Sequence, residues 1–113
     1  MKKDKAYLQD MLDAIHDIRV FMKSVGEKEF FKNKEKQYAV IRGLEILGEA
    51  SKNISKELKE KYPDIPWRDI AGMRDKLIHM YFGVKIELVM ETVLHKLPVL
   101  GKQLKTILRS NKF

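Results

Sequence analysis

The chain has 113 residues, of which 35% are charged and 44% are apolar, and its formal net charge is +7. This length suits one domain with a modest core and is too short for two, while the lack of cysteine excludes disulfides and thiolate metal sites and favours the cytoplasm. The start, MKKDKAYLQDML, has charges at its beginning and no long apolar run, so we expect a soluble protein without a signal peptide or a membrane span.

Apolar residues recur at helical spacing from Leu8 onward and predict a first helix over about 5–25. Asp4 precedes this stretch as the expected helix cap, and Gly26 follows it as a stop signal. The expected buried stripe consists of Leu8, Met11, Leu12, Ile15, Ile18, Met22 and Val25.

A second, long helix is predicted over about 33–61, and the charged segment EKEFFKNKEK is expected to carry Phe30 and Phe31 into it. Gly43 and Gly48 within this helix indicate either a bend or a close approach of another backbone. Its expected buried stripe consists of Val40, Leu44, Leu47, Ser51, Ile54 and Leu58.

The sequence YPDIPW, residues 62–67, interrupts the helical pattern because Pro63 and Pro66 bias the residues before them away from the helical conformation. A third helix is predicted to follow over about 67–82 and to end at Gly83.

A fourth helix is predicted over 84–97, and a fifth over 98–111 with Pro98 in its first turn. The fifth helix carries a stripe of Leu100, Leu104, Ile107 and Leu108. No segment alternates between apolar and polar residues for long enough to predict a strand. The expected fold is therefore all-α, an antiparallel bundle of four to five helices in one domain over residues 1–113.

Four polar or aromatic side chains stand close together in the third predicted helix: Arg74, Asp75, His79 and Tyr81. At about 100° per residue, Tyr81 shares a face with Arg74, whereas His79 lies about 140° away and close to Asp75. One helix therefore does not aim Arg74 and His79 at a single point. A twofold homodimer that pairs two copies of this helix would bring them into one shared cleft.

Such a cluster, without cysteine and with few carboxylates nearby, suits phosphate chemistry that uses neither metal nor cofactor. Histidine can transfer a proton near neutral pH, and a guanidinium can stabilise negative charge on phosphate oxygens. RNA supplies its own nucleophile, because its 2′-hydroxyl can attack the adjacent phosphate once a base removes the proton.

The motif RDKLIHMY, residues 74–81, resembles the signature of the HEPN superfamily, specifically its HepT-like toxin branch. The segments RGLEILGEASKNIS, YPDIPWRDIAGMRDKLIHMYFGV and LPVL resemble that branch in the same order, so the likeness covers roughly residues 5–105.

This resemblance implies an all-helical homodimer that acts as a metal-independent endoribonuclease toxin on RNA. By resemblance, Arg74 stabilises the scissile phosphate, His79 handles the proton, and Asp75 occupies the polar position after the arginine. The resemblance also implies a partner, a minimal nucleotidyltransferase that serves as antitoxin and attaches AMP to a tyrosine near the site. Tyr81 is the matching tyrosine in this sequence.

Each of these residues also has a structural interpretation. His79 fits a surface histidine paired with Asp75, Arg74 fits a bridge between helices, and Tyr81 fits a core or interface aromatic. Two other functions stay open: a non-catalytic helical partner of a nucleotidyltransferase that binds nucleotide or RNA, and a DNA-binding regulator. The rigid YPDIPW connection is too long for a helix-turn-helix and disfavours the regulator.

The other two histidines, His16 and His95, are expected to be solvated rather than catalytic. From Lys96 onward the sequence has five basic residues and no acidic one. This tail could guide RNA or complement the negative end of the last helix.

Overall fold

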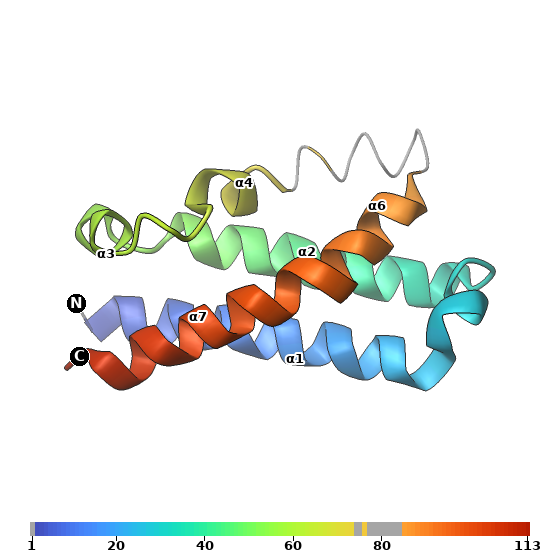
Figure 1. Ribbon diagram of the computed structural model, residues 1–113, viewed down its shortest axis with the longest axis horizontal. Coiled ribbons are helices and arrows are strands. Elements are labelled where there is room, and N and C mark those ends of the chain that lie inside the picture. The colour runs from blue at the N-terminus through green and yellow to red at the C-terminus, as the bar shows by residue number, and fades with distance from the viewer. Residues whose placement is uncertain (1, 74–75, 77–84) are drawn as a thin grey trace.

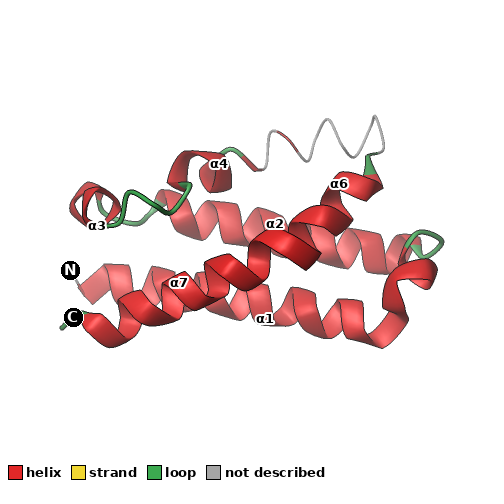
Figure 2. Ribbon diagram, viewed as in Figure 1, coloured by secondary structure: helices red, strands yellow, loops and turns green. Residues whose placement is uncertain are grey.

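The computed structural model describes residues 2–73, 76 and 85–113, and every regular element among them is helical (Figure 2). The body of the bundle consists of α1 (Lys2–Phe30), α2 (Lys34–Lys52) and α7 (Leu97–Ser110). Helix α1 runs antiparallel to both α2 and α7 (Figure 1). The shorter elements are α3 (Lys56–Lys61), α4 (Trp67–Ala71), α6 (Ile86–Glu91) and the π-helical turn η1 (Thr92–Lys96). The predicted all-α class is confirmed for this part of the chain.

The core lies between α1, α2 and α7, and the three predicted stripes supply most of it. On α1 the stripe is buried except for Leu12 and Val25, which are partly buried at its edge. On α7 it is buried except for the partly buried Leu108. Within the described part of the chain, no helix combines the length and the apolar character that crossing a membrane requires.

The end of the first helix differs from the prediction. Gly26 has φ 72° and ψ 169°, so the backbone leaves the helical conformation there, as the stop signal predicts. A further helical turn follows, however, and α1 extends to Phe30. Phe30 is buried, so it belongs to the end of the first helix rather than to the start of the second.

The single helix predicted over 33–61 is wrong, because α2 ends at Lys52 and α3 begins at Lys56. Ser55 caps α3, and its hydroxyl accepts a hydrogen bond from the Leu58 backbone N–H at 3.2 Å. Asp4 lies inside α1 and does not cap it from outside. Its buried carboxylate accepts hydrogen bonds from the Ser55 backbone N–H (2.8 Å) and from the Ser55 hydroxyl (2.6 Å).

The two glycines of α2 mark close contacts, which was one of the two predicted alternatives. A Cβ at Gly43 would lie 2.5 Å from Cγ1 of Ile18 on α1. A Cβ at Gly48 would lie 2.9 Å from the carbonyl oxygen of Ile70 on α4. Gly43 thus lets α1 approach α2, and Gly48 lets the backbone of α4 rest directly on α2.

The YPDIPW segment forms the predicted break, and α4 starts at Trp67 as expected. The buried Trp67 donates a hydrogen bond from Nε1 to the carbonyl oxygen of Tyr62 at 2.9 Å. The Tyr62 hydroxyl accepts a hydrogen bond from Asn111 Nδ2 at 2.7 Å, and Lys61 Nζ donates to Asn111 Oδ1 at 2.7 Å. These bonds tie the connection before α4 to the end of α7.

The fourth predicted helix is not a continuous α-helix, because α6 passes into the π-helical turn η1 before α7. The Leu97 backbone N–H donates to the Thr92 carbonyl, five residues earlier. Pro98 has no N–H, and its ring crowds the carbonyl four residues before it, which accounts for the wider turn. Pro98 lies in the first turn of α7, as predicted.

Candidate active-site groove

The motif residues Arg74, Asp75, His79 and Tyr81 lie outside the residues that the structure describes, so their predicted roles stay predictions. The described chain approaches the motif from α4 through Met73, includes Lys76, and resumes at Lys85. Met73 and Lys85 are the described residues on either side of the motif segment, and Lys76 lies within it. All three line one groove.

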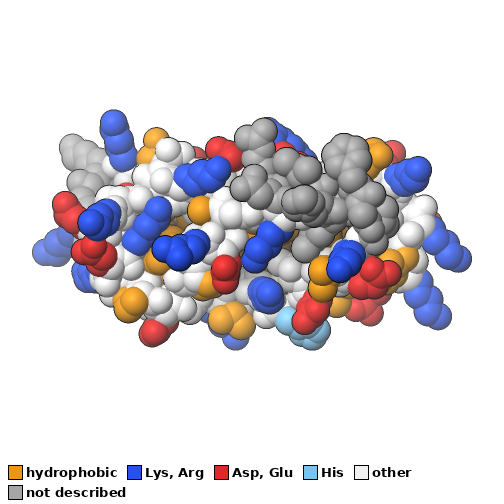
Figure 3. Space-filling view, turned by 90° about the horizontal axis from the view of Figure 1, so that it is seen from above, with side chains coloured by type: hydrophobic (Ala, Val, Ile, Leu, Met, Phe, Trp, Pro, Cys, Tyr) orange, Lys and Arg blue, Asp and Glu red, His pale blue; other side chains and the backbone are white. Residues whose placement is uncertain are grey.

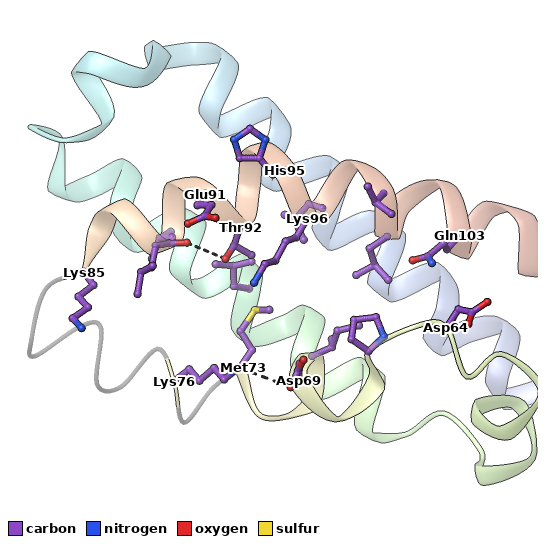
Figure 4. Close-up of a pocket in the computed structure, with 18 residues that line it drawn as sticks. Asp64, Asp69, Met73, Lys76, Lys85, Glu91, Thr92, His95, Lys96 and Gln103 are labelled. Carbon is purple, nitrogen blue, oxygen red and sulfur yellow. Dashed lines mark hydrogen bonds and ion pairs between the residues drawn. The ribbon is translucent and has the colours of Figure 1, made fainter.

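The groove has a volume of about 850 Å³ and lies between α4 on one side and α6, η1 and α7 on the other, with α2 beneath (Figure 4). Apolar side chains from α2, α6, α7 and the segment from α4 to Met73 line it: Leu44, Ile70, Met73, Leu88, Val89, Leu97, Val99 and Leu100. Leu88 on α6 and Val99 on α7 remain 41% and 58% exposed, respectively, so the groove presents apolar surface to solvent.

Two packing features hold the α4 side of the groove in place. Gly48 lets the Ile70 backbone approach α2 closely, and the buried Trp67 anchors the start of α4 through its bond to Tyr62. The chain therefore reaches Met73 from a fixed position. The residues responsible are Gly48 within α2 and Trp67, which follows Pro63 and Pro66 in the YPDIPW segment.

The charged groups of the groove are unevenly distributed along it (Figure 4). Lys76 and Lys85 lie toward one end and Lys96 near the middle, with Asp69 and Glu91 among them. Asp64 lies at the other end beside Gln103 and has no lysine next to it among the labelled residues. The Lys76 Nζ lies 4.0 Å from the Asp69 Oδ1. Both side chains are exposed, so this ion pair contributes little to stability. Across the face seen from above, lysine and arginine side chains are mixed with acidic ones (Figure 3).

Sequence reasoning did not find the groove residues Met73, Lys85 and Lys96. They come from segments up to twenty-three positions apart (73 to 96) that only the packing of α4 against α6, η1 and α7 unites. The one available signal was Pro98, whose position predicts a disturbed helix just before it.

The two remaining histidines are both exposed, as expected. His16 lies on the outer side of α1, but His95 lies on η1 and lines the groove. Within the described ranges, no group of three or more His, Asp or Glu side chains is arranged to hold a metal ion. Neither observation assigns a role to the groove by itself.

The family model named "Ribonuclease HepT-like" matches residues 11–107, which includes the groove and the motif segment. The chain belongs to the HepT-like ribonuclease family. The resemblance seen in RDKLIHMY and its neighbouring segments is thereby confirmed. No solved structure gives a significant match to the chain.

Several curated relatives are similar over nearly the whole chain. A protein of Thermococcus cleftensis named "Probable ribonuclease HepT" is 48% identical over 99 residues, which are 88% of this chain and 90% of that protein. A protein of Methanocaldococcus jannaschii named "Putative RNase MJ1216" is 48% identical over 109 residues, 96% of this chain and 90% of that protein. A larger protein of the same organism, named "Gamma-glutamylcyclotransferase and putative RNase MJ0434", is 45% identical over 109 residues, and these are 49% of its length.

Proposed function

We propose that this HepT-like chain is a metal-independent endoribonuclease whose active site is assembled from Arg74 and His79 of two copies. The observation that carries the proposal is that the motif RDKLIHMY occupies residues 74–81 of a chain whose family model, named for a ribonuclease, spans residues 11–107. The named relatives, which share 45–48% of their aligned residues with this chain, support the same activity.

The proposed reaction needs only a proton carrier and a positive group. A base, His79, takes the proton of the 2′-hydroxyl, and the 2′-oxygen attacks the adjacent phosphorus. Arg74 stabilises the charge that builds on the non-bridging phosphate oxygens. The bond to the 5′-oxygen breaks and that oxygen takes a proton from water, which leaves a 2′,3′-cyclic phosphate and a 5′-hydroxyl. Asp75 acts as a supporting polar residue.

The proposal includes a homodimer, because helical spacing predicts that Arg74 and His79 point about 140° apart on one chain. Exposed apolar surface at Leu88 and Val99, which both line the groove, supports a protein contact on this face. A twofold contact would place the motif segments of the two copies opposite each other.

Cleavage of a labelled RNA in EDTA tests the activity. We expect Arg74→Ala and His79→Ala each to lower the rate by about 10²–10⁴. Equal rates for both variants and the unaltered protein would exclude the assignment and favour the non-catalytic alternative, a helical subunit that binds nucleotide or RNA beside a nucleotidyltransferase.

Mixing the two inactive variants tests whether the site is shared. After exchange of subunits, half of the dimers are mixed, and one of the two Arg–His sites in each mixed dimer is intact. The mixture should therefore recover about a quarter of the unaltered activity. Recovery is not expected if both residues of each site come from one copy, and its absence would contradict the shared site.

Control of this activity is the last part of the proposal. A minimal nucleotidyltransferase acting as antitoxin would attach AMP to Tyr81, which adds bulk and negative charge where the RNA phosphate approaches. Mass spectrometry after incubation with the candidate transferase and ATP should find AMP on Tyr81, together with lost cleavage. Modified Tyr81 with undiminished cleavage would refute the blocking mechanism. Tyr81→Phe is the matched control that cannot be modified.

A further inference from the structure

Lys96 is the last residue of the π-helical turn η1, and its side chain reaches into the groove. It extends from η1 toward Met73, whereas His95 projects from the opposite side of the same helix (Figure 4). His95 and Lys96 both line the groove, and consecutive residues of a helix point about 100° apart. Of the two side chains, Lys96 is the one that extends toward Met73 (Figure 4).

The Lys96 ammonium is exposed and makes no ion pair with a carboxylate of the described residues. Lys85, at the end of the groove where the chain leaves the motif segment, is in the same situation. Lys76 differs from both, because Asp69 lies 4.0 Å away. Of the other acids, Glu91 is four residues from His95 along the helix, and Asp64 is at the far end of the groove (Figure 4).

Two unpaired ammonium groups on one groove favour an anionic ligand with more than one charge. Lysine binds phosphate oxygens as a compact point charge, and its aliphatic stem can lie along apolar surface while the ammonium stays in solvent. Met73, toward which Lys96 extends, offers such a surface (Figure 4). Lys85 is the first described residue after the motif segment, and Met73 is the last one before it. A ligand held in this groove by both lysines would therefore contact the described residues that flank the motif.

We propose that Lys85 and Lys96 bind two backbone phosphates of an RNA strand and hold the strand beside residues 74–81. This inference rests on the ribonuclease function proposed above and adds the residues that position its substrate. Both are positioning residues, because neither is placed at the reacting atoms. The pair binds through charge, so it does not select a base sequence.

The size of the effect follows from counterion release. For a single strand, the slope of log K against log salt concentration changes by about 0.7 for each phosphate contact. Loss of one contact therefore lowers the affinity about fivefold at 0.1 M salt, and loss of two lowers it about 25-fold. Lys96→Arg keeps the charge and should retain most of the affinity.

The test uses a short single-stranded 2′-O-methyl oligoribonucleotide, which has no free 2′-hydroxyl and so is bound without being cleaved. Fluorescence anisotropy would measure its affinity between about 50 and 300 mM KCl for the unaltered protein, Lys85→Ala, Lys96→Ala, the double variant and Lys96→Arg. Lys102→Ala is the matched control, because Lys102 is exposed on α7 and does not line the groove.

We expect the slope to fall by about 0.7 in each single variant and by about 1.4 in the double variant, with Lys102→Ala unchanged. Unchanged slopes in the groove variants, or an equal decrease in Lys102→Ala, would overturn the inference. So would sedimentation showing that Lys96→Ala dissociates a dimer, because Lys96 would then serve the contact between copies.

The binding assay also separates this inference from the proposed function. A reduced slope in a protein that cleaves no RNA would support the phosphate pair and contradict the nuclease. If cleavage depends on His79 but the slopes do not change in Lys85→Ala and Lys96→Ala, the result would support the nuclease and contradict the phosphate pair.

Discussion

Replacing Asp4 should destabilise the protein more than any charge change on the outer surface of α1. The Asp4 side chain is 3% exposed and accepts two hydrogen bonds from Ser55, one from its backbone N–H and one from its hydroxyl. A hydrogen bond to a charged group contributes about 1.5–3 kcal/mol. Because the two bonds share one carboxylate and one partner residue, we expect Asp4→Ala to cost about 3 kcal/mol rather than the full sum.

This cost converts to a large shift in the midpoint of thermal unfolding. At about 2.1 cal/mol/K per residue, a chain of 113 residues has an unfolding entropy of about 0.24 kcal/mol/K. Asp4→Ala should therefore lower Tm by about 12 °C, measured by circular dichroism. Asp4→Asn keeps one acceptor for the Ser55 N–H and should fall between Asp4→Ala and the unaltered protein.

Asp10→Ala is the matched control, because it removes the same charge from an exposed position of the same helix. It should change Tm by no more than about 2 °C. If Asp4→Ala unfolds within about 3 °C of Asp10→Ala, the bond between α1 and the start of α3 does not stabilise the fold as argued.

Three further changes test two contacts of α4 and the backbone turn near the end of α1. Gly48→Ala should lower the free energy of unfolding by about 1–2 kcal/mol, because the new Cβ would lie 2.9 Å from the Ile70 carbonyl oxygen. This loss should exceed the gain from the better helix propensity of alanine. Urea denaturation measures the change, and a gain in stability would contradict the close contact. Trp67→Phe should lower the free energy of unfolding by about 1–2 kcal/mol, since the Tyr62 carbonyl loses its donor. Circular dichroism must report the urea unfolding of this variant, because Trp67 is the single tryptophan. Gly26→Ala should cost about 1 kcal/mol through its positive φ alone, since a Cβ there meets no atom within 4 Å, and a neutral result would contradict the left-handed turn.

The periodicity of apolar residues predicted which side of each long helix is buried, but it could not divide the helices correctly. The stripe from Val40 to Leu58 continues through the break at residues 53–55, because Ile54 and Leu58 are buried beside α2 even though they lie beyond it. The break depends on Ser55 acting as a cap and on Asp4, 51 positions earlier, accepting its hydrogen bonds. A bond between residues so far apart leaves no trace in a local pattern.

The candidate site was predictable only in part for a related reason. The motif from Arg74 to Tyr81 is contiguous in the sequence and could be recognised there. The groove unites Met73 with Lys85 and Lys96, and Lys96 belongs to a π-helical turn that no periodic pattern predicts. Pro98 indicates that the helix is disturbed, but the proline alone does not determine whether it kinks, ends or widens.

The two ends of the chain lie together beside α3, at one end of the bundle, whereas α6 and the lysine-rich part of the groove lie toward the other end (Figure 1). A second folded unit joined at either terminus would therefore extend away from Lys85 and leave RNA free to enter from the opposite end. In the larger Methanocaldococcus jannaschii relative, whose name pairs a gamma-glutamylcyclotransferase with an RNase, the matching region makes up 49% of the length. An affinity tag or fluorescent protein can be attached in the same way for the binding measurements.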